Sequence, residues 1–282
     1  MGPSGATLYM GGSFTMVGGR VRLHLAAVAT DGGAVRLWHA NTDGAVDALT
    51  VSATRLYAGG AFLHVKGATR NRLAAIGITS SAPLAAWTPH ANAQVRALAV
   101  SPGGGRVFAG GDFTLMNGHA VEHMAALLVA HGGVRPYGAH PSYPVTSIAV
   151  TPLTTYIGGA GNGGHIAAFT AVSGARRWSV ETDGDVQGVA VRDGAVYAGG
   201  HFNNDCKGNL GTGNPLVCTT PIARRHLLAV NAATGALTTW NPDLDSISGV
   251  FAVSATARQV VAGGVFTKVH GKLQQGVARF TP

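Results

Sequence analysis

The chain has 282 residues, a formal net charge of +8 and 42 glycines, with 46% hydrophobic and 11% charged residues. Modest charge with abundant apolar residues excludes intrinsic disorder, and the glycines argue against a helical bundle, because each destabilises a helix interior by about 1 kcal/mol. No apolar run reaches the ~20 residues of a membrane-spanning helix, and the first residues do not resemble a signal peptide. We therefore expect many short strands joined by glycine-containing turns.

The first predicted strand, "ATLYMGG" at 6–12, ends in a pair of glycines, and this signature recurs along the chain. A phosphate-binding loop would need a following Gly-Lys-Ser/Thr and a helix, so we interpret the pairs as strand ends where another backbone approaches closely. The six pairs begin at Gly11, Gly59, Gly110, Gly158, Gly199 and Gly263. In five repeats a phenylalanine stands two residues after the second glycine: Phe14, Phe62, Phe113, Phe202 and Phe266.

Further landmarks follow each glycine pair in the same order. A small apolar run such as "LAAI" (73–76) comes first, an aromatic residue follows about ten residues later, and another apolar run is centred eleven residues after that aromatic. Each repeat thus holds four strand-like runs, a to d, as at 46–51, 55–60, 73–78 and 83–87. The pattern predicts an all-β fold, a single six-bladed β-propeller over 1–282 with four-stranded antiparallel blades. A parallel β-helix is the weaker alternative, because it has shorter coils and no fixed strand count.

The repeats at the two ends of the chain are truncated. The sequence starts in a b strand and ends just after a c strand, so 22 strands are expected in the six blades. We therefore expect an incomplete seam in the ring, with unpaired strand edges that invite strand addition.

Two repeats carry a family resemblance. The segments "LYAGGAFLHVKGATRNRLAAI" (56–76) and "VFAGGDFTLMNGHAVEHMAAL" (107–127) resemble the glycine-rich propeller repeats of large secreted bacterial proteins, called delta-60 repeats. The resemblance covers nearly the whole chain and implies a propeller within an extracellular, multidomain protein. It implies no catalytic residue, because the family motif is structural.

The loops between strands b and c vary most. They span twelve residues in four repeats, six in the fourth repeat and 26 in the fifth, and they hold ten of the twenty Lys and Arg residues. We therefore predict that the face formed by the b–c and d–a loops is the working face. The longest loop contains an insert, 203–223, with both cysteines. Cys206 and Cys218 predict one disulfide, and hence an oxidising compartment and a secreted protein.

Candidate ligand-binding residues lie mainly in the d–a loops and near the start of strand a, which would line the central channel. Turn chemistry is the competing interpretation, because Asp-Gly and Asn-Pro pairs are common there. No EF-hand spacing is present, so no cofactor is expected, with calcium as the alternative. The candidates are Asp43, Asp47, His90, Arg96, His140, Asp183, Gln187 and Asp245, together with Arg70 and Arg224 in the b–c loops.

A basic residue stands directly before the c run in five repeats. Metal ligands must converge within roughly 4 Å, whereas c strands of different blades stand apart, so we expect hydrogen bonds to neighbouring loops rather than a metal site. These residues are His24, Arg72, His123, His165 and His226.

The function expected from the sequence is recognition rather than catalysis. The partner would be a glycan or cell-surface polymer, or another protein or domain, bound at the b–c/d–a face. A glycoside hydrolase or lyase in the channel is an alternative, but nothing selects the two carboxylates it needs. A structural spacer is the second alternative. The arginines are dispersed without a nucleic-acid motif, so neither nucleic-acid binding nor membrane insertion is expected.

Overall fold

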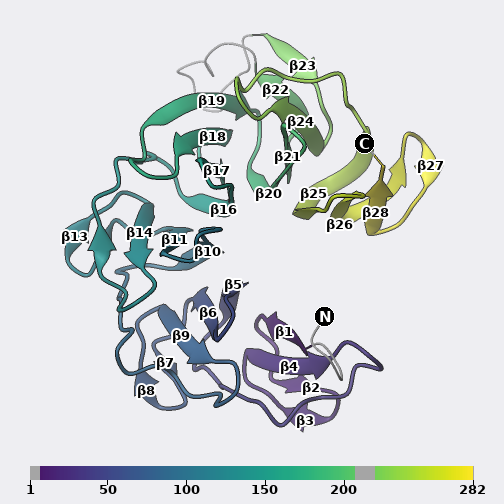
Figure 1. The fold of residues 1–282 in the computed structure, drawn as a ribbon. Coiled ribbons are helices and arrows are strands. Elements are labelled where there is room, and N and C mark those ends of the chain that lie inside the picture. Colours follow the sequence, from purple (N-terminus) through teal and green to yellow (C-terminus); the bar gives the residue numbers. More distant parts are fainter. Residues whose placement is uncertain (1–6, 207–219, 282) are drawn as a thin grey trace. The chain divides into compact units, whose positions relative to one another are not determined.

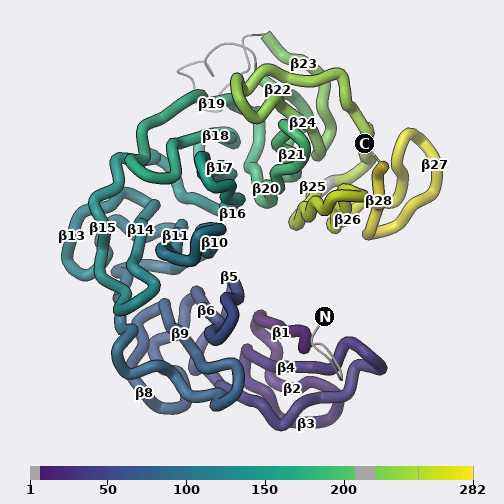
Figure 2. Tube along the Cα trace, viewed as in Figure 1, coloured from purple at the N-terminus to yellow at the C-terminus, as the bar shows by residue number. Residues whose placement is uncertain are grey.

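The structure, a computed structural model, describes residues 7–206 and 220–281. These residues form 28 strands and no helix. Figure 1 draws the strands as arrows, and Figure 2 follows the same chain as a tube. No described segment is therefore a helix that could cross a membrane. The chain divides into two compact units, Met1–Pro136 and Tyr137–Pro282, which we call unit 1 and unit 2. The single domain over 1–282 stays a prediction.

Unit 1 contains three antiparallel sheets, one from each of the first three repeats. The sheets are β1(Thr7–Gly11)–β4(Leu25–Ala29), β5(Val46–Val51)–β6(Arg55–Gly60)–β9(Leu73–Gly77) and β10(Val95–Val100)–β11(Arg106–Gly111)–β14(Met124–Leu128)–β15(Val134–Arg135). A two-stranded hairpin interrupts each b–c loop: β2(Met16–Val17)–β3(Arg20–Val21), β7(His64–Val65)–β8(Ala68–Thr69) and β12(Leu115–Met116)–β13(His119–Ala120).

Unit 2 repeats this arrangement with more variation. Its sheets are β16(Val145–Val150)–β17(Thr154–Gly159)–β18(Gly164–Thr170)–β19(Arg176–Thr182), β20(Val186–Arg192)–β21(Ala195–Gly200)–β24(Leu227–Asn231) and β25(Leu244–Ala255)–β26(Val260–Val269)–β28(Val277–Phe280). The hairpin β22(Asn204–Cys206)–β23(Pro221–Ala223) extends the first of these sheets by pairing with β19, and β27(Lys272–Leu273) pairs with the end of β26.

The predicted a, b and c strands are confirmed in both units, whereas strand d is only partly formed. A full d strand exists in the fourth repeat as β19, and a two-residue strand in the third as β15. Elsewhere single bridges replace it: Val28 with Val35, Ile76 with Pro83, and Val230 with Leu237. Pro83 illustrates a reason, since proline cannot donate to a strand ladder. The strand count differs from the predicted 22 because of these bridges and the unexpected hairpins.

The glycine pairs allow close approach of two different neighbours, as predicted. A β-carbon on Gly59 would lie 2.6 Å from the Val95 side chain in the next sheet. A β-carbon on Gly60 would clash with the carbonyl oxygen of Ala45, which precedes strand a of its own sheet. The missing side chain of the first glycine therefore leaves room for the next repeat. The missing side chain of the second leaves room for the backbone before strand a of the same repeat. Equivalent clashes with a carbonyl oxygen occur at Gly111, Gly200 and Gly264.

The residue before strand c has a conformational role. Arg72 adopts a left-handed conformation with φ of 69°. Its N–H donates to the carbonyl of the buried Phe62 at 2.8 Å, and its carbonyl accepts from the N–H of Gly60 at 3.1 Å. This locks the corner between the glycine pair and strand c. His24, His123, His226 and Gly276 occupy the same corner with φ of 64°, 68°, 64° and 72°.

Aromatic pairs attach the d segments where a strand ladder is missing. Tyr57 of β6 packs edge-to-face against Trp87, with ring centroids 5.1 Å apart. The indole N–H of the buried Trp87 donates to the carbonyl of Leu128 in the next sheet at 3.1 Å. Each such pair therefore links one repeat to the following one. An equivalent indole bond joins Trp38 to Gly77, and Trp178 makes one to Ala232 although its strand, β19, has a ladder.

Candidate functional site

The b–c loops are built around tight hairpins, which the sequence interpretation treated as plain loops. Four of them turn through two residues with positive φ, the backbone of a type I′ turn. The sequence did carry the signal, because Asn-Gly and related X-Gly dipeptides favour this turn. The turn residues are Gly18–Gly19, Lys66–Gly67, Asn117–Gly118 and His270–Gly271, with φ between 47° and 80°.

From the second repeat on, a carboxylate or amide from the preceding d–a loop holds the start of the b–c loop in four repeats. Asp43 Oδ1 accepts the N–H groups of Leu63 and His64, both at 2.8 Å, and its Oδ2 lies 2.6 Å from His64 Nδ1. Asn92 Oδ1 accepts two backbone N–H groups at 2.9 Å in the next repeat. Asp183 and Asp245 cap the loops of the fifth and sixth repeats in the same way.

These bonds give the candidate acids Asp43, Asp183 and Asp245 partners within the chain. Partial burial works to raise the pKa of Asp43, but hydrogen bonds from His64 and Leu63 outweigh it and hold the pKa below its usual value. The hydroxyl of Thr267, followed by backbone N–H groups, likewise lowers the pKa of Asp245. The three carboxylates fix the loops through these hydrogen bonds. Their role in ligand binding stays a prediction.

The candidates at the start of strand a share a different feature. Asp47, Arg96 and Gln187 stand where the register of strand a shifts in a β-bulge, as does Thr146. A bulge redirects a side chain out of the regular alternation, which explains why polar residues recur here. Thr146 donates its hydroxyl to the carbonyl of Val186.

Two bulge residues of unit 1 already have charged or polar partners. Asp47 Oδ2 accepts a hydrogen bond from Gln94 Nε2 at 2.8 Å. Arg96 forms a two-point ion pair with Asp112, with N–O distances of 2.7 and 2.8 Å. Hydrogen bonding to Asp112 raises the pKa of Arg96, so it stays charged. A ligand at Asp47 or Arg96 would have to displace these partners.

The candidate arginines of the b–c loops fasten their loops to the d segments. Arg70 is buried, with 8% exposure, and its guanidinium donates to the carbonyls of Thr69 at 2.6 Å and Leu84 at 3.0 Å. Arg224 donates in the same way to Ala223 at 2.8 Å and Thr238 at 2.9 Å. The terminal nitrogens of both guanidinium groups are thus engaged within the chain, whereas each buried Nε has no hydrogen-bond partner among the described residues.

The histidines do not assemble a metal site in the part of the chain that the structure describes. No group of three or more His, Cys, Asp or Glu residues there could hold a metal ion. His90 and His140 are both exposed. The Nδ1 of His123 lies 3.1 Å from the carbonyl of Gly111, and the ring of His165 stacks on Tyr143 with centroids 3.8 Å apart.

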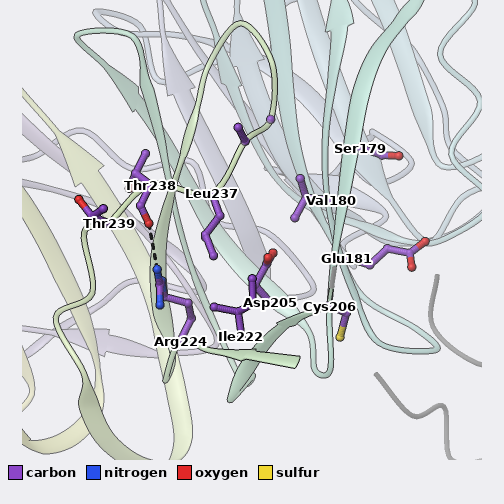
Figure 3. A pocket seen from close by; sticks show the side chains of 12 residues that line it. Ser179, Val180, Glu181, Asp205, Cys206, Ile222, Arg224, Leu237, Thr238 and Thr239 are labelled. Atoms are coloured by element: carbon purple, nitrogen blue, oxygen red, sulfur yellow. Dashed lines mark hydrogen bonds between the residues drawn. The ribbon is translucent and has the colours of Figure 1, made fainter. Parts of the chain in front are cut away.

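A pocket of about 670 Å³ lies in unit 2 beside the hairpin of the insert. It is bordered by β19, the β22–β23 hairpin and residues 235–239 (Figure 3). Apolar side chains of Val180, Ile222 and Leu237 surround the carboxylate of Asp205.

Asp205 is the functional candidate that sequence reasoning missed. Its side chain is 5% exposed, and burial raises its pKa to about 6, with the charge of Arg224 working in the opposite direction. Cys206 is its neighbour in β22, but Cys218 lies outside the described residues, so the disulfide stays a prediction. The sequence signal for Asp205 was its position relative to the phenylalanine of its repeat. It stands three residues after Phe202, where other repeats place Val17, Val65, Met116 and Val269.

Comparison with known proteins identifies the fold. No protein-family model and no curated protein matches the chain. The WD40 repeats of RRP9 are similar in structure, with a TM-score of 0.58 and 11% identity over 90% of this chain and 73% of that one. The Neurospora crassa Pan2 WD40 domain is similar with a TM-score of 0.57 and 12% identity, over 90% and 74%. At these identities the likeness shows the fold alone, that of the β-propellers.

Proposed function

We propose that the chain is an extracellular recognition module, a six-bladed β-propeller that binds a partner protein through its b–c loops. The observation that carries the proposal is the surface of the hairpins in unit 1. Met16, Leu63 and Leu115 are 57%, 41% and 40% exposed there. Arg20 and Lys66 are exposed at or beside the turns of two of these hairpins. Met and Arg are enriched in protein interfaces, so this surface favours a protein partner with apolar and acidic groups over a glycan.

The rigidity of the loops supports recognition. A cap from the d–a loop fixes the hairpins β7–β8 and β12–β13, and single bridges from Thr42 to Val65 and from Ala91 to Met116 tie these hairpins to the d–a loops. Pre-organised loops lose less conformational entropy on binding. The hydrolase alternative has less support, because the carboxylates of Asp43 and Asp183 are engaged by loop amides. Secretion rests on the resemblance to delta-60 repeats and on the predicted disulfide.

The test compares two triple variants of the full chain by affinity capture from the secreted and surface proteins of the source organism, with a glycan array alongside. The loop variant is Met16→Ser, Leu63→Ser and Leu115→Ser. The control variant changes three exposed apolar residues at the short a–b and c–d turns: Val51→Ser, Leu153→Ser and Val172→Ser.

We expect the wild type and the turn variant to retain the same partner protein, and the loop variant to bind it at least tenfold more weakly at an unchanged melting temperature. Loss of capture in the turn variant alone would refute the assignment of the working face. Glycan binding that only the loop variant loses would replace the protein partner with a glycan. Inertness of all three proteins would favour a structural spacer.

A further inference from the structure

Asp205 breaks the pattern of the repeats at a buried position. Val65 and Met116 occupy the same place after the conserved phenylalanine, and both are fully buried at 0% exposure. The fifth repeat keeps the backbone arrangement, since Asp205 pairs with Thr182 of β19 as Val65 pairs with Thr42. A carboxylate has therefore replaced an apolar side chain without a change of local fold.

The carboxylate of Asp205 has an unsatisfied oxygen. Its Oδ1 is inaccessible to solvent and has no hydrogen-bond partner in the described part of the chain. An isolated buried charge costs several kcal/mol unless it is paired. A group that the fold does not need and that is costly to bury indicates a function.

The environment of Asp205 defines what would complement it. Figure 3 shows the carboxylate directed between Leu237 and Val180, with Ile222 beside it. The volume of about 670 Å³ lies in the range of small-molecule sites. Apolar side chains next to a buried carboxylate match a ligand with an apolar body and one positive charge.

Two other charged residues line the pocket, and together they do not reverse its preference for a cation. Arg224 lines the pocket, and its two terminal nitrogens donate to the carbonyls of Ala223 and Thr238, the second of which Figure 3 shows. Its buried Nε has no hydrogen-bond partner among the described residues. Glu181 of β19 adds a second carboxylate to the lining. With one cation against two carboxylates, the lining has a net charge of −1 when both acids are ionised.

We propose that this pocket binds the ammonium group of an alkylamine, with Asp205 as the counter-ion and Val180, Ile222 and Leu237 against the alkyl chain. The ammonium donates a hydrogen bond to the carboxylate of Asp205 from the pocket side and adds a second positive charge beside that of Arg224. The amine is either a free molecule or the side chain of an accessible lysine, because both present the same group.

The test is calorimetric titration of the full chain with n-butylammonium chloride, with 1-pentanol as a neutral ligand of similar size. We expect the wild type to bind the amine at least tenfold more tightly than the alcohol. We also expect Asp205→Asn to reduce amine affinity at least tenfold. Asp185→Asn is the matched control, because it removes the same charge in unit 2 outside the pocket lining. It should leave amine affinity within twofold.

The pH dependence gives a test that needs no variant. Asp205, with a pKa of about 6, ionises between pH 5 and 7.5, so amine affinity of the wild type should rise about tenfold over this range. Equal affinity for amine and alcohol, or a pH-independent affinity, would overturn the proposal. The blocked peptide acetyl-Gly-Lys-Gly-amide distinguishes a lysine side chain from a free amine as the natural ligand. If the peptide binds more tightly than n-butylammonium, the ligand is a lysine side chain. If it binds more weakly, the ligand is a free amine.

Discussion

The hairpin β7–β8 of unit 1 and the hairpin β22–β23 of unit 2 use the same position in opposite ways. Val65 fills the first with a fully buried apolar side chain, whereas Asp205 places a carboxylate in the second. Both residues pair with the d–a segment before them, through Thr42 and Thr182. The same backbone arrangement therefore holds an apolar residue in one repeat and a carboxylate in another. In the fifth repeat, this position adjoins a pocket of about 670 Å³.

The largest effect is expected when a carboxylate is placed at the equivalent buried position of unit 1, Val65. Val65→Asp should lower the free energy of unfolding by about 3 kcal/mol or more, because Val65 is completely buried among apolar residues. Urea denaturation followed by tryptophan fluorescence measures the shift. The exposed neighbour Lys66, changed to Asp, is the control and should move the midpoint little. An equally small effect at Val65 would mean that the position itself tolerates charge.

The reverse substitution should stabilise the protein. Asp205→Val restores the residue type of the other repeats and removes a carboxylate whose pKa burial raises to about 6. We expect a gain of about 2 kcal/mol at pH 7 in the unfolding of unit 2, together with loss of n-butylammonium binding. Wild-type stability or less at pH 7 would show that Asp205 is satisfied within the fold.

The repeat architecture followed from the sequence because its signals are local and recur. Glycine pairs, phenylalanines and tryptophans recur at fixed spacing, and each has one steric role, as Gly60 and Trp87 illustrate. The d strands were overestimated, because an apolar run such as 83–87 can attach through its tryptophan without forming a ladder. Periodicity alone does not separate these two outcomes.

The candidate site was harder to predict, because charge was taken as a sign of exposure. Asp43, Arg70 and Arg224 satisfy backbone groups of their own loops, which depends on how each loop folds. Asp205 was overlooked within the insert, although alignment on the phenylalanines places it at a buried position. Its burial and its pocket depend on β19 and residues 235–239, which are distant in sequence.

The pH dependence of stability tests the buried charge of Asp205 without a change in the volume of its side chain. The pKa of Asp205 is higher in the folded state than the usual 3.8, so the folded state binds a proton more readily than the unfolded state between about pH 4 and 6. Stability from this group is therefore present at low pH and is lost as pH rises through 6. Between pH 7 and 4.5 we expect the wild type to gain about 2 kcal/mol relative to Asp205→Asn. Parallel pH profiles for the two proteins would contradict the raised pKa.

The smallest expected effect concerns the caps, which are common to both units. Asp43→Ala leaves the N–H groups of Leu63 and His64 without their acceptor and should reduce stability by about 1 kcal/mol, since the site is partly exposed. Asp43→Asn should be nearly neutral, because Asn92 already caps the next hairpin with its amide oxygen. Urea denaturation of both variants measures the difference. If asparagine costs as much as alanine, the ion pair with His64 rather than the cap holds the loop, and the caps of unit 1 are not interchangeable.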